Sequence, residues 1–208
     1  LGKTAVPVLD RPGFVVNRLL VLLLGVVVGA IEDGTPVEVA DHALDRLGLP
    51  MPPFELFDLV GPAVGLHVLT SLRADLGERF PRSPGLERLV AEGTVVVLPR
   101  PAPGLPRRVD PAIQAVFDAA REHPRRDTPL DGQGLLDAVL TALTVEVGHL
   151  LDEHVVPSAD QVDLCMILGA GWPSHLGGLT PLLDRTGYSE RVLGHRLLPP
   201  GTADVPQD

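Results

Sequence analysis

Four side chains that could bind a metal or move a proton fall close together in the sequence: Glu146, His149, Glu153 and His154. Residues three apart on a helix share a face, so Glu146 and His149 would point to the same side. Carboxylates and imidazoles bind zinc, but a zinc site needs a third protein ligand that this spacing does not supply. The sequence therefore favours a solvated polar face, or charges at a helix end, over a metal site.

The common catalytic motifs are absent from the sequence. It has no Gly-x-Gly-x-x-Gly, no Walker A motif, no Gly-x-Ser-x-Gly and no His-Glu-x-x-His. Gly169-Ala170-Gly171 is similar to the opening of a dinucleotide-binding loop, but it lacks the third glycine and follows a predicted helix. The other histidines with no partner evident from spacing are His42, His67, His175 and His195.

Asn17 is a polar residue one turn inside a predicted helix that is otherwise apolar, where asparagine has poor helix propensity. Two interpretations are open. Its side chain hydrogen-bonds the backbone of the preceding Pro12-Gly13 turn, or its amide donates to a carbonyl in a neighbouring pocket. Cys165 lies on the apolar face of another predicted helix, and we expect a buried, unreactive thiol there.

The composition is that of a globular chain. Of the 208 residues, 45% are hydrophobic and 21% are charged, which excludes a disordered or fibrous chain. The net charge of −10 argues against a broad basic surface for nucleic acid. A single cysteine excludes an internal disulfide and a thiolate zinc site. The chain begins at Leu1 without Met or a secretory signal, so we expect a piece of a longer cytoplasmic protein.

Two elements are predicted near the start of the chain. The Val-rich segment from Thr4 to Leu9 precedes a turn and is predicted to be a short strand. A helix is predicted from about Phe14, and it is apolar without interruption over residues 19–31. This run is shorter than the roughly 20 residues that span a bilayer, so we predict no membrane span. A helix that is apolar on all sides is typical of the centre of a bundle.

Start and stop signals predict further helices. Thr35 and Glu38 have the spacing of a capping box, in which each side chain bonds the other residue's backbone N–H. Ser158 and Gln161 have the same spacing. Apolar periodicity bounded by glycine and proline predicts helices at 54–60, 63–76, 84–93, 111–122 and 132–154. The dense prolines of 99–109 predict a linker.

The second half of the chain repeats the order of features in the first. In both halves a long apolar helix leads to a capping box, then to a Gly-x-Pro, then to an Asp before a Gly. An internal duplication explains this order, and we expect the two copies to pack as a pseudo-symmetric pair. The predicted divisions are a first helical unit, a linker, a second helical unit and a tail, at 1–98, 99–109, 110–198 and 199–208.

Two strings in the first half resemble the C-terminal domain of the 3-hydroxyacyl-CoA dehydrogenases. They are DRPGFVVNRLL at 10–20 and GLPMPPFELFDLVG at 48–61. The second half resembles the second copy of that domain in the multifunctional fatty-acid oxidation proteins, through Glu146 and the segments 158–163, 169–173, 177–178 and 184–187. The likeness covers nearly all of residues 1–198. Two departures from the family pattern are Gly25-Val26-Val27, where Asn-Glu-Ala is common, and Leu168, where some multifunctional members have an aromatic residue.

The resemblance implies an all-α fold of two tandem, pseudo-symmetric helical units, similar to the C-terminal part of 6-phosphogluconate dehydrogenase. It implies that the strand at Thr4–Leu9 belongs to an upstream Rossmann domain, which binds NAD and carries the catalytic His and Glu. This chain would then hold no catalytic, cofactor-binding or metal-binding residue. By the motif match, Asn17 is the family's substrate-binding asparagine, which hydrogen-bonds the substrate near its reacting oxygen.

The implied reaction is the NAD-dependent oxidation of 3-hydroxyacyl-CoA to 3-oxoacyl-CoA in fatty-acid β-oxidation. This chain would supply the substrate-binding and dimerisation region, and we expect it to be inactive alone. The implied partners are the substrate, the upstream Rossmann domain, and a second copy of the protein or a thiolase subunit. The alternative is a helical interaction module of the same ancestry without catalysis, which the proline-rich linker favours.

Overall fold

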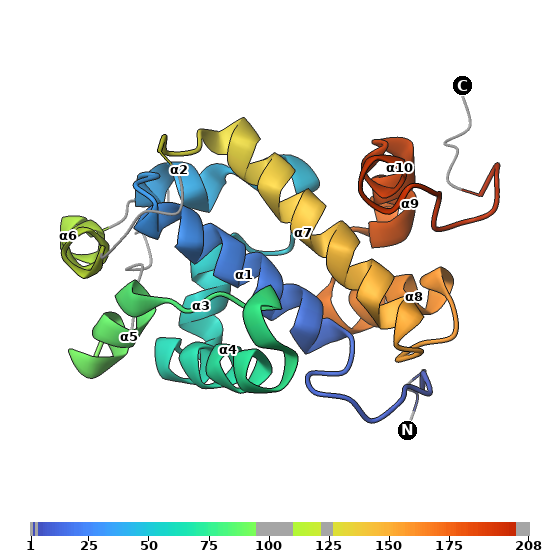
Figure 1. Cartoon of the computed structure of the whole chain (residues 1–208), viewed down its shortest axis with the longest axis horizontal. Helices are drawn as coiled ribbons and strands as arrows, with labels where there is room; N and C mark the ends of the chain where they lie inside the picture. Colours follow the sequence, from blue (N-terminus) through green and yellow to red (C-terminus); the bar gives the residue numbers. More distant parts are fainter. Residues whose placement is uncertain (1, 3, 95–109, 122–126, 203–208) are drawn as a thin grey trace. The chain divides into compact units, whose positions relative to one another are not determined.

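The computed structural model describes residues 2, 4–94, 110–121 and 127–202, and all regular secondary structure in these ranges is helical (Figure 1). The predicted all-α fold is therefore confirmed. The α-helices are α1 (Val16–Glu32), α2 (Val37–His42), α3 (Pro53–Val60), α4 (Pro62–Leu76), α5 (Pro84–Ala91), α6 (Pro111–Ala120), α7 (Gly132–Asp152), α8 (Ala159–Ala170), α9 (Leu179–Arg185) and α10 (Tyr188–Leu193). Short 3₁₀ turns occupy Asp45–Leu47, Gly77–Arg79 and Ser174–Leu176.

Most of the predicted helices are confirmed. The helices expected at 54–60, 63–76, 84–93 and 132–154 are α3, α4, α5 and α7, each within a few residues of its predicted ends. Ser83 caps α5, because its Oγ accepts a hydrogen bond of 3.2 Å from the N–H of Leu86.

The strand predicted at Thr4–Leu9 is not formed. These residues have no regular secondary structure, and the described part of the chain offers no neighbouring strand with which they could form a ladder. One backbone hydrogen bond holds the segment, from Leu9 N–H to the Val155 carbonyl at 2.9 Å. A Val-rich alternating segment forms a strand only where a second strand is available to pair with it, and the described residues supply none.

The two predicted capping boxes are also wrong. Helix α2 begins after Pro36, and Thr35 bonds elsewhere: its Oγ1 donates to the Leu130 carbonyl at 3.0 Å and accepts from the Leu130 N–H at 3.1 Å. Ser158 does occupy the N-cap of α8, but its side chain makes no capping hydrogen bond. A buried tertiary partner for Thr35 replaces the local bond that the spacing suggested.

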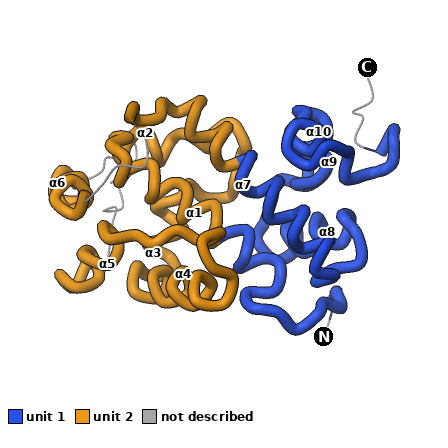
Figure 2. The backbone as a smooth tube through the Cα atoms, in the orientation of Figure 1, with its two compact units in different colours: residues 1–20, 140–208 blue, residues 21–139 orange. Residues whose placement is uncertain are grey.

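Two compact units make up the structure (Figure 2). Unit 1 comprises residues 1–20 and 140–208, and unit 2 comprises residues 21–139. Helices α1 and α7 therefore each contribute residues to both units. The predicted divisions at 98, 110 and 198 separate repeated copies along the sequence, which the two compact units do not test, so these divisions remain predictions. The predicted linker 99–109 lies outside the described residues.

Unit 2 is built around the apolar part of α1, as predicted for this helix. Val27 and Ile31 are fully buried, and a Cβ placed on Gly25 would lie 3.1 Å from Pro81, so this glycine allows a close approach. Helix α1 ends at Glu32. The buried carboxylate of Glu32 accepts hydrogen bonds from the Ser83 hydroxyl and from the Gly85 N–H. This carboxylate ties the end of α1 to the start of α5.

Unit 1 is held by two buried aspartates. Asp163 of α8 accepts bonds from the N–H and the hydroxyl of Thr180, at 2.8 and 2.5 Å, and so caps the start of α9. Asp184 accepts bonds from the Ser189 hydroxyl and from the N–H groups of two residues in the C-terminal segment, Leu197 and Leu198. Each carboxylate thus accepts hydrogen bonds from backbone N–H groups that have no partner within a helix.

The two long helices end in the same hydrogen-bond pattern. After α1, the Gly34 N–H bonds the Ile31 carbonyl and the Thr35 N–H bonds the Ala30 carbonyl. After α7, the His154 N–H bonds the Leu151 carbonyl and the Val155 N–H bonds the Leu150 carbonyl. Gly34 and His154 both have positive φ, at 107° and 53°, as the Schellman motif requires.

Among the described helices, α7 is the one that is long and apolar enough to cross a membrane. A bent pair, α3 together with residues 62–79, qualifies only if it is counted as one span despite its 97° bend. Half of the apolar window of α7 is buried inside the protein, and the buried core helix of a protein outside the membrane passes the same test.

Candidate functional site

Asn17 is the second residue of α1 and its side chain is exposed. Its amide makes no hydrogen bond to the described residues, so the interpretation in which Asn17 bonds the preceding turn does not hold. A free amide at the first turn of a helix can donate to a carbonyl or an alkoxide oxygen, but it cannot take up or release a proton near neutral pH. The position suits binding and orientation rather than acid–base chemistry.

The turn before Asn17 has an unusual backbone. Gly13 has φ 72° and Phe14 has φ 47°, and both lie in the left-handed region. For a bulky residue such as Phe14 this conformation costs on the order of 1–3 kcal/mol, and it persists where the surroundings fix it. The Phe14 ring is half exposed, three residues before Asn17. The strained turn therefore presents an aromatic surface beside the start of α1.

Arg18 follows Asn17 and is completely buried. Its Nε donates to Glu146 Oε1 at 2.6 Å, its Nη2 also contacts Glu146 Oε1, and its Nη1 donates to Glu153 Oε2 at 2.9 Å. Glu146 is buried in α7, and Glu153, one-third exposed, follows the end of that helix. We call Arg18, Glu146 and Glu153 the Arg18 cluster. It joins the first turn of α1 to the C-terminal half of α7 within unit 1.

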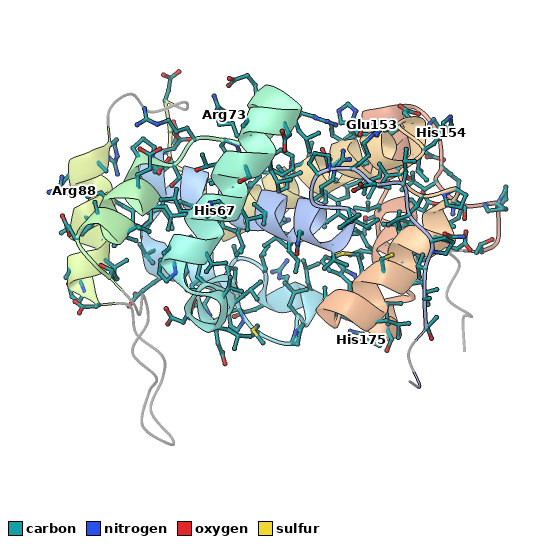
Figure 3. The ribbon with its side chains drawn as sticks, turned by 90° about the horizontal axis from the view of Figure 1, so that it is seen from below. His67, Arg73, Arg88, Glu153, His154 and His175 are labelled. Atoms are coloured by element: carbon teal, nitrogen blue, oxygen red, sulfur yellow. The ribbon has the colours of Figure 1, made fainter. Side chains whose placement is uncertain are left out.

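The cluster corrects the prediction made for Glu146 and its neighbours. Glu146 was expected on a solvated polar face, but it is 1% exposed and paired with an arginine. Among the described residues, no group of three or more His, Cys, Asp or Glu side chains is arranged to hold a metal. His149 is half-buried and His154 is exposed, with Glu153 and His154 adjacent at the end of α7 (Figure 3). The unrecognised signal was Arg18 itself, a charged residue entering a long apolar run.

Helix α8 packs against the start of α1. A Cβ placed on Gly169 would lie 3.0 Å from the Val16 side chain, so glycine is needed for this approach. Leu168, next to it, is 60% exposed. Gly171 ends α8 in the left-handed conformation, with φ 67°, so Gly169-Ala170-Gly171 closes a helix. Phosphate-binding glycine loops instead precede a helix N-terminus, where free N–H groups point at the anion.

The remaining residues singled out from sequence are not members of the Arg18 cluster. His67 lies on α4 with Arg73, and His175 lies in the turn after α8 (Figure 3). His42 bonds Asp45 at 2.8 Å on the surface of unit 2. Cys165 is half-buried rather than fully buried, and burial raises the pKa of its thiol, which favours the unreactive protonated form.

The start of α1 also lies in a segment that matches a known protein family. Residues 13–96 match the family described as 3-hydroxyacyl-CoA dehydrogenase, C-terminal domain. This segment belongs to that family. The match begins at the strained Gly13-Phe14 turn and includes Asn17 and Arg18, so the resemblance drawn from the sequence is confirmed for the first half of the chain. The 3-hydroxyacyl-CoA dehydrogenases are oxidoreductases of fatty-acid oxidation, and the helical domain matched here is their C-terminal part.

Relatives extend the likeness beyond the matched segment. The chain is 29% identical over 203 residues to the fatty acid oxidation complex subunit alpha of Acinetobacter baumannii, covering 92% of this chain and 28% of the relative. It is 29% identical over 198 residues to the subunit of that name from Shewanella frigidimarina, covering 92% and 27%. The chain thus spans little more than a quarter of the length of these curated relatives.

A solved structure shares the helical fold seen here. The chain is similar to 3-hydroxybutyryl-CoA dehydrogenase from Escherichia coli K12, with a TM-score of 0.63 over 97% of this chain and 61% of that one. The two sequences are 18% identical. At this identity the likeness supports the helical fold, and it does not transfer the activity of that enzyme.

Proposed function

We propose that this chain forms the substrate-binding part of an NAD-dependent 3-hydroxyacyl-CoA dehydrogenase, and that Asn17 hydrogen-bonds the substrate near its reacting oxygen. The observation that supports this most is the exposed amide of Asn17, which bonds no described residue, beside the buried Arg18 cluster in the segment that matches the family. An amide N–H directed at the C3 oxygen stabilises the charge that develops there as the alcohol becomes a ketone.

The described residues of this chain do not fit NAD. They contain no strand, so there is no strand–turn–helix unit to cradle a pyrophosphate, and the glycine segment 169–171 closes a helix. We propose that NAD and the catalytic His and Glu belong to an upstream Rossmann domain of a longer polypeptide. The relatives, more than three times the length of this chain, leave room for such a domain.

The tandem organisation is part of the same proposal. We propose that 1–98 and 110–198 are two copies of one helical unit, joined by 99–109 and followed by the tail 199–208. The matching ends of α1 and α7 support a common origin. So do the two aspartates that accept a bond at the start of the next helix: Asp41 from the Phe54 N–H at 3.3 Å, and Asp163 from the Thr180 N–H.

The proposed partners follow from the family and from the relatives. They are the 3-hydroxyacyl-CoA substrate, the upstream Rossmann domain, and either a second copy of the protein or a thiolase subunit. We propose a cytoplasmic location and no binding of nucleic acid, in keeping with the net charge of −10.

One experiment separates the proposal from the alternative of a non-catalytic helical module. The complete natural polypeptide and the 208-residue chain are each mixed with 3-hydroxybutyryl-CoA and NAD, and NADH formation is followed. The proposal expects NADH from the complete polypeptide and none from the 208-residue chain alone. NADH from the isolated chain would show that the catalytic groups lie within it, whereas a folded but inactive complete polypeptide would support the module.

A further inference from the structure

Arg18 and Asn17 are neighbours with opposite environments: the Arg18 side chain is 0% exposed, and that of Asn17 is exposed. Consecutive helix residues point about 100° apart, so fixing one of them fixes the direction of the other. We propose that Arg18 is a positioning residue, and that its bonds to Glu146 and Glu153 hold the first turn of α1 so that the Asn17 amide is correctly aimed. This inference rests on the proposed function of Asn17.

The geometry of the Arg18 cluster is suited to this task. The guanidinium is planar, and two carboxylates on different sides of it leave little freedom to rotate. Nε and Nη2 meet Glu146, and Nη1 meets Glu153 seven residues further along. Glu146 lies inside α7, and Glu153 directly follows it, so both acceptors are carried by one long helix. The start of α1 is thereby fixed to a rigid element.

A purely stabilising role explains the cluster less well. Burying an ion pair removes hydration from both charges, and apolar replacements of similar volume are often as stable or more stable. A cluster kept only to hold two helices together could therefore be replaced by hydrophobic side chains with little loss. What the charges add is a single defined geometry.

The proposed duplication sets an apolar pair against this ion pair. The matching ends of α1 and α7 set Gly34 against His154, a spacing of 120 residues. At the same spacing Arg18 corresponds to Ala138, Glu146 corresponds to Val26, and Asn17 corresponds to Asp137. The pair equivalent to Arg18 and Glu146 is therefore Ala138 and Val26, one residue from each proposed copy, and both are apolar. The charged pair stands beside the amide and the apolar pair beside Asp137, as a positioning role requires.

The test uses the complete natural polypeptide and the double variant Arg18→Met/Glu146→Leu, which removes the fully buried pair and leaves Glu153, one-third exposed, in contact with water. We expect kcat for 3-hydroxybutyryl-CoA to fall by about tenfold or more, as for a misplaced reacting group, with an unchanged KM for NAD. Arg73→Met is the matched control, because Arg73 bonds Glu78 and the Phe80 carbonyl in unit 2, and its kcat should equal the wild-type value.

A second arm places the same double variant in an Asn17→Ala background. If Arg18 acts through Asn17, its removal should change the kcat of that background by less than about twofold. Equal losses in both backgrounds, or a double variant with wild-type kcat, would overturn the inference while leaving Asn17 in its role. An Asn17→Ala variant with wild-type kcat would instead overturn the proposed function. Should the double variant not fold, Arg18→Lys is measured in both backgrounds against the same criterion.

Discussion

Arg18 and Glu146 are 128 residues apart in the chain, yet the guanidinium Nε of one lies 2.6 Å from the carboxylate of the other, and both side chains are buried. This contact joins the N-terminal turn of α1 to α7 inside unit 1. It places a fixed cation directly beside an exposed asparagine. The relationship between the two residues is the basis for the functional account, and the other features of the fold supply independent tests of the structure.

His154, in the turn that ends α7, is a position where a substitution should stabilise the folded chain. His154 holds a left-handed backbone with φ 53°, which is strained by about 1–2 kcal/mol for a residue with a Cβ. His154→Gly should raise the free energy of unfolding of the 208-residue chain by roughly 0.5–1 kcal/mol, since glycine loses part of the gain through its own chain entropy. Chemical denaturation measures the change. The matched control His149→Gly, within α7, should lower the stability instead, because glycine is a poor helix former.

The contact between α5 and α6 predicts a severe effect of one methyl group. A Cβ on Gly85 would lie 2.3 Å from Cδ1 of the buried Phe117 ring. Gly85→Ala should therefore destabilise the chain by about 1–3 kcal/mol or more through overpacking. Gly132→Ala is the control, since the nearest atom to its Cβ is 3.9 Å away. If Gly85→Ala unfolds at the same denaturant concentration as the control, the packing of α6 on α5 is wrong.

Asp163 predicts a component of stability that depends on pH. Burial raises the pKa of this carboxyl to about 6, against the opposing hydrogen bonds from Thr180 and Leu179. Because the pKa in the folded chain lies above the unfolded value of 3.8, the folded state binds the proton more tightly. The stabilisation is therefore fully present below about pH 4 and is lost as the pH rises through about 6.

The variant Asp163→Asn removes this titration. Between pH 7 and pH 5, wild type should gain about 1 kcal/mol of unfolding free energy relative to the variant. Urea denaturation at the two pH values gives the difference directly, and comparing the two proteins cancels the contribution of the other carboxyl groups. A difference that is constant across this range would show that the Asp163 carboxyl titrates alike in the folded and unfolded chain.

Much of the helical fold follows from local sequence signals. Apolar periodicity and the Gly and Pro boundaries predicted α3, α4, α5 and α7. Local signals failed where a distant residue supplied the partner. Thr35 bonds Leu130 rather than its own helix, and Thr4–Leu9 has no strand beside it. The periodicity of a segment does not indicate which remote group will compete for its hydrogen bonds.

The candidate site was predictable in part. Asn17 was singled out because an amide in an apolar helix is unusual, and because the surrounding string resembles a known domain. The Arg18 cluster was not found, since nothing in the spacing of Glu146 and Glu153 points to a cation 128 residues earlier. Only the packing of α1 against α7 within unit 1 brings these charges together.

The most direct test of the account is the turnover of Asn17→Ala in the complete natural polypeptide. Removal of a positioned donor at the reacting oxygen should lower kcat for 3-hydroxybutyryl-CoA on the order of 100-fold, while the affinity for NAD stays unchanged. Steady-state NADH formation gives kcat, and titration of protein fluorescence gives NAD affinity. A variant with wild-type kcat would contradict the account, because Asn17 would then make no contact that matters to the reaction.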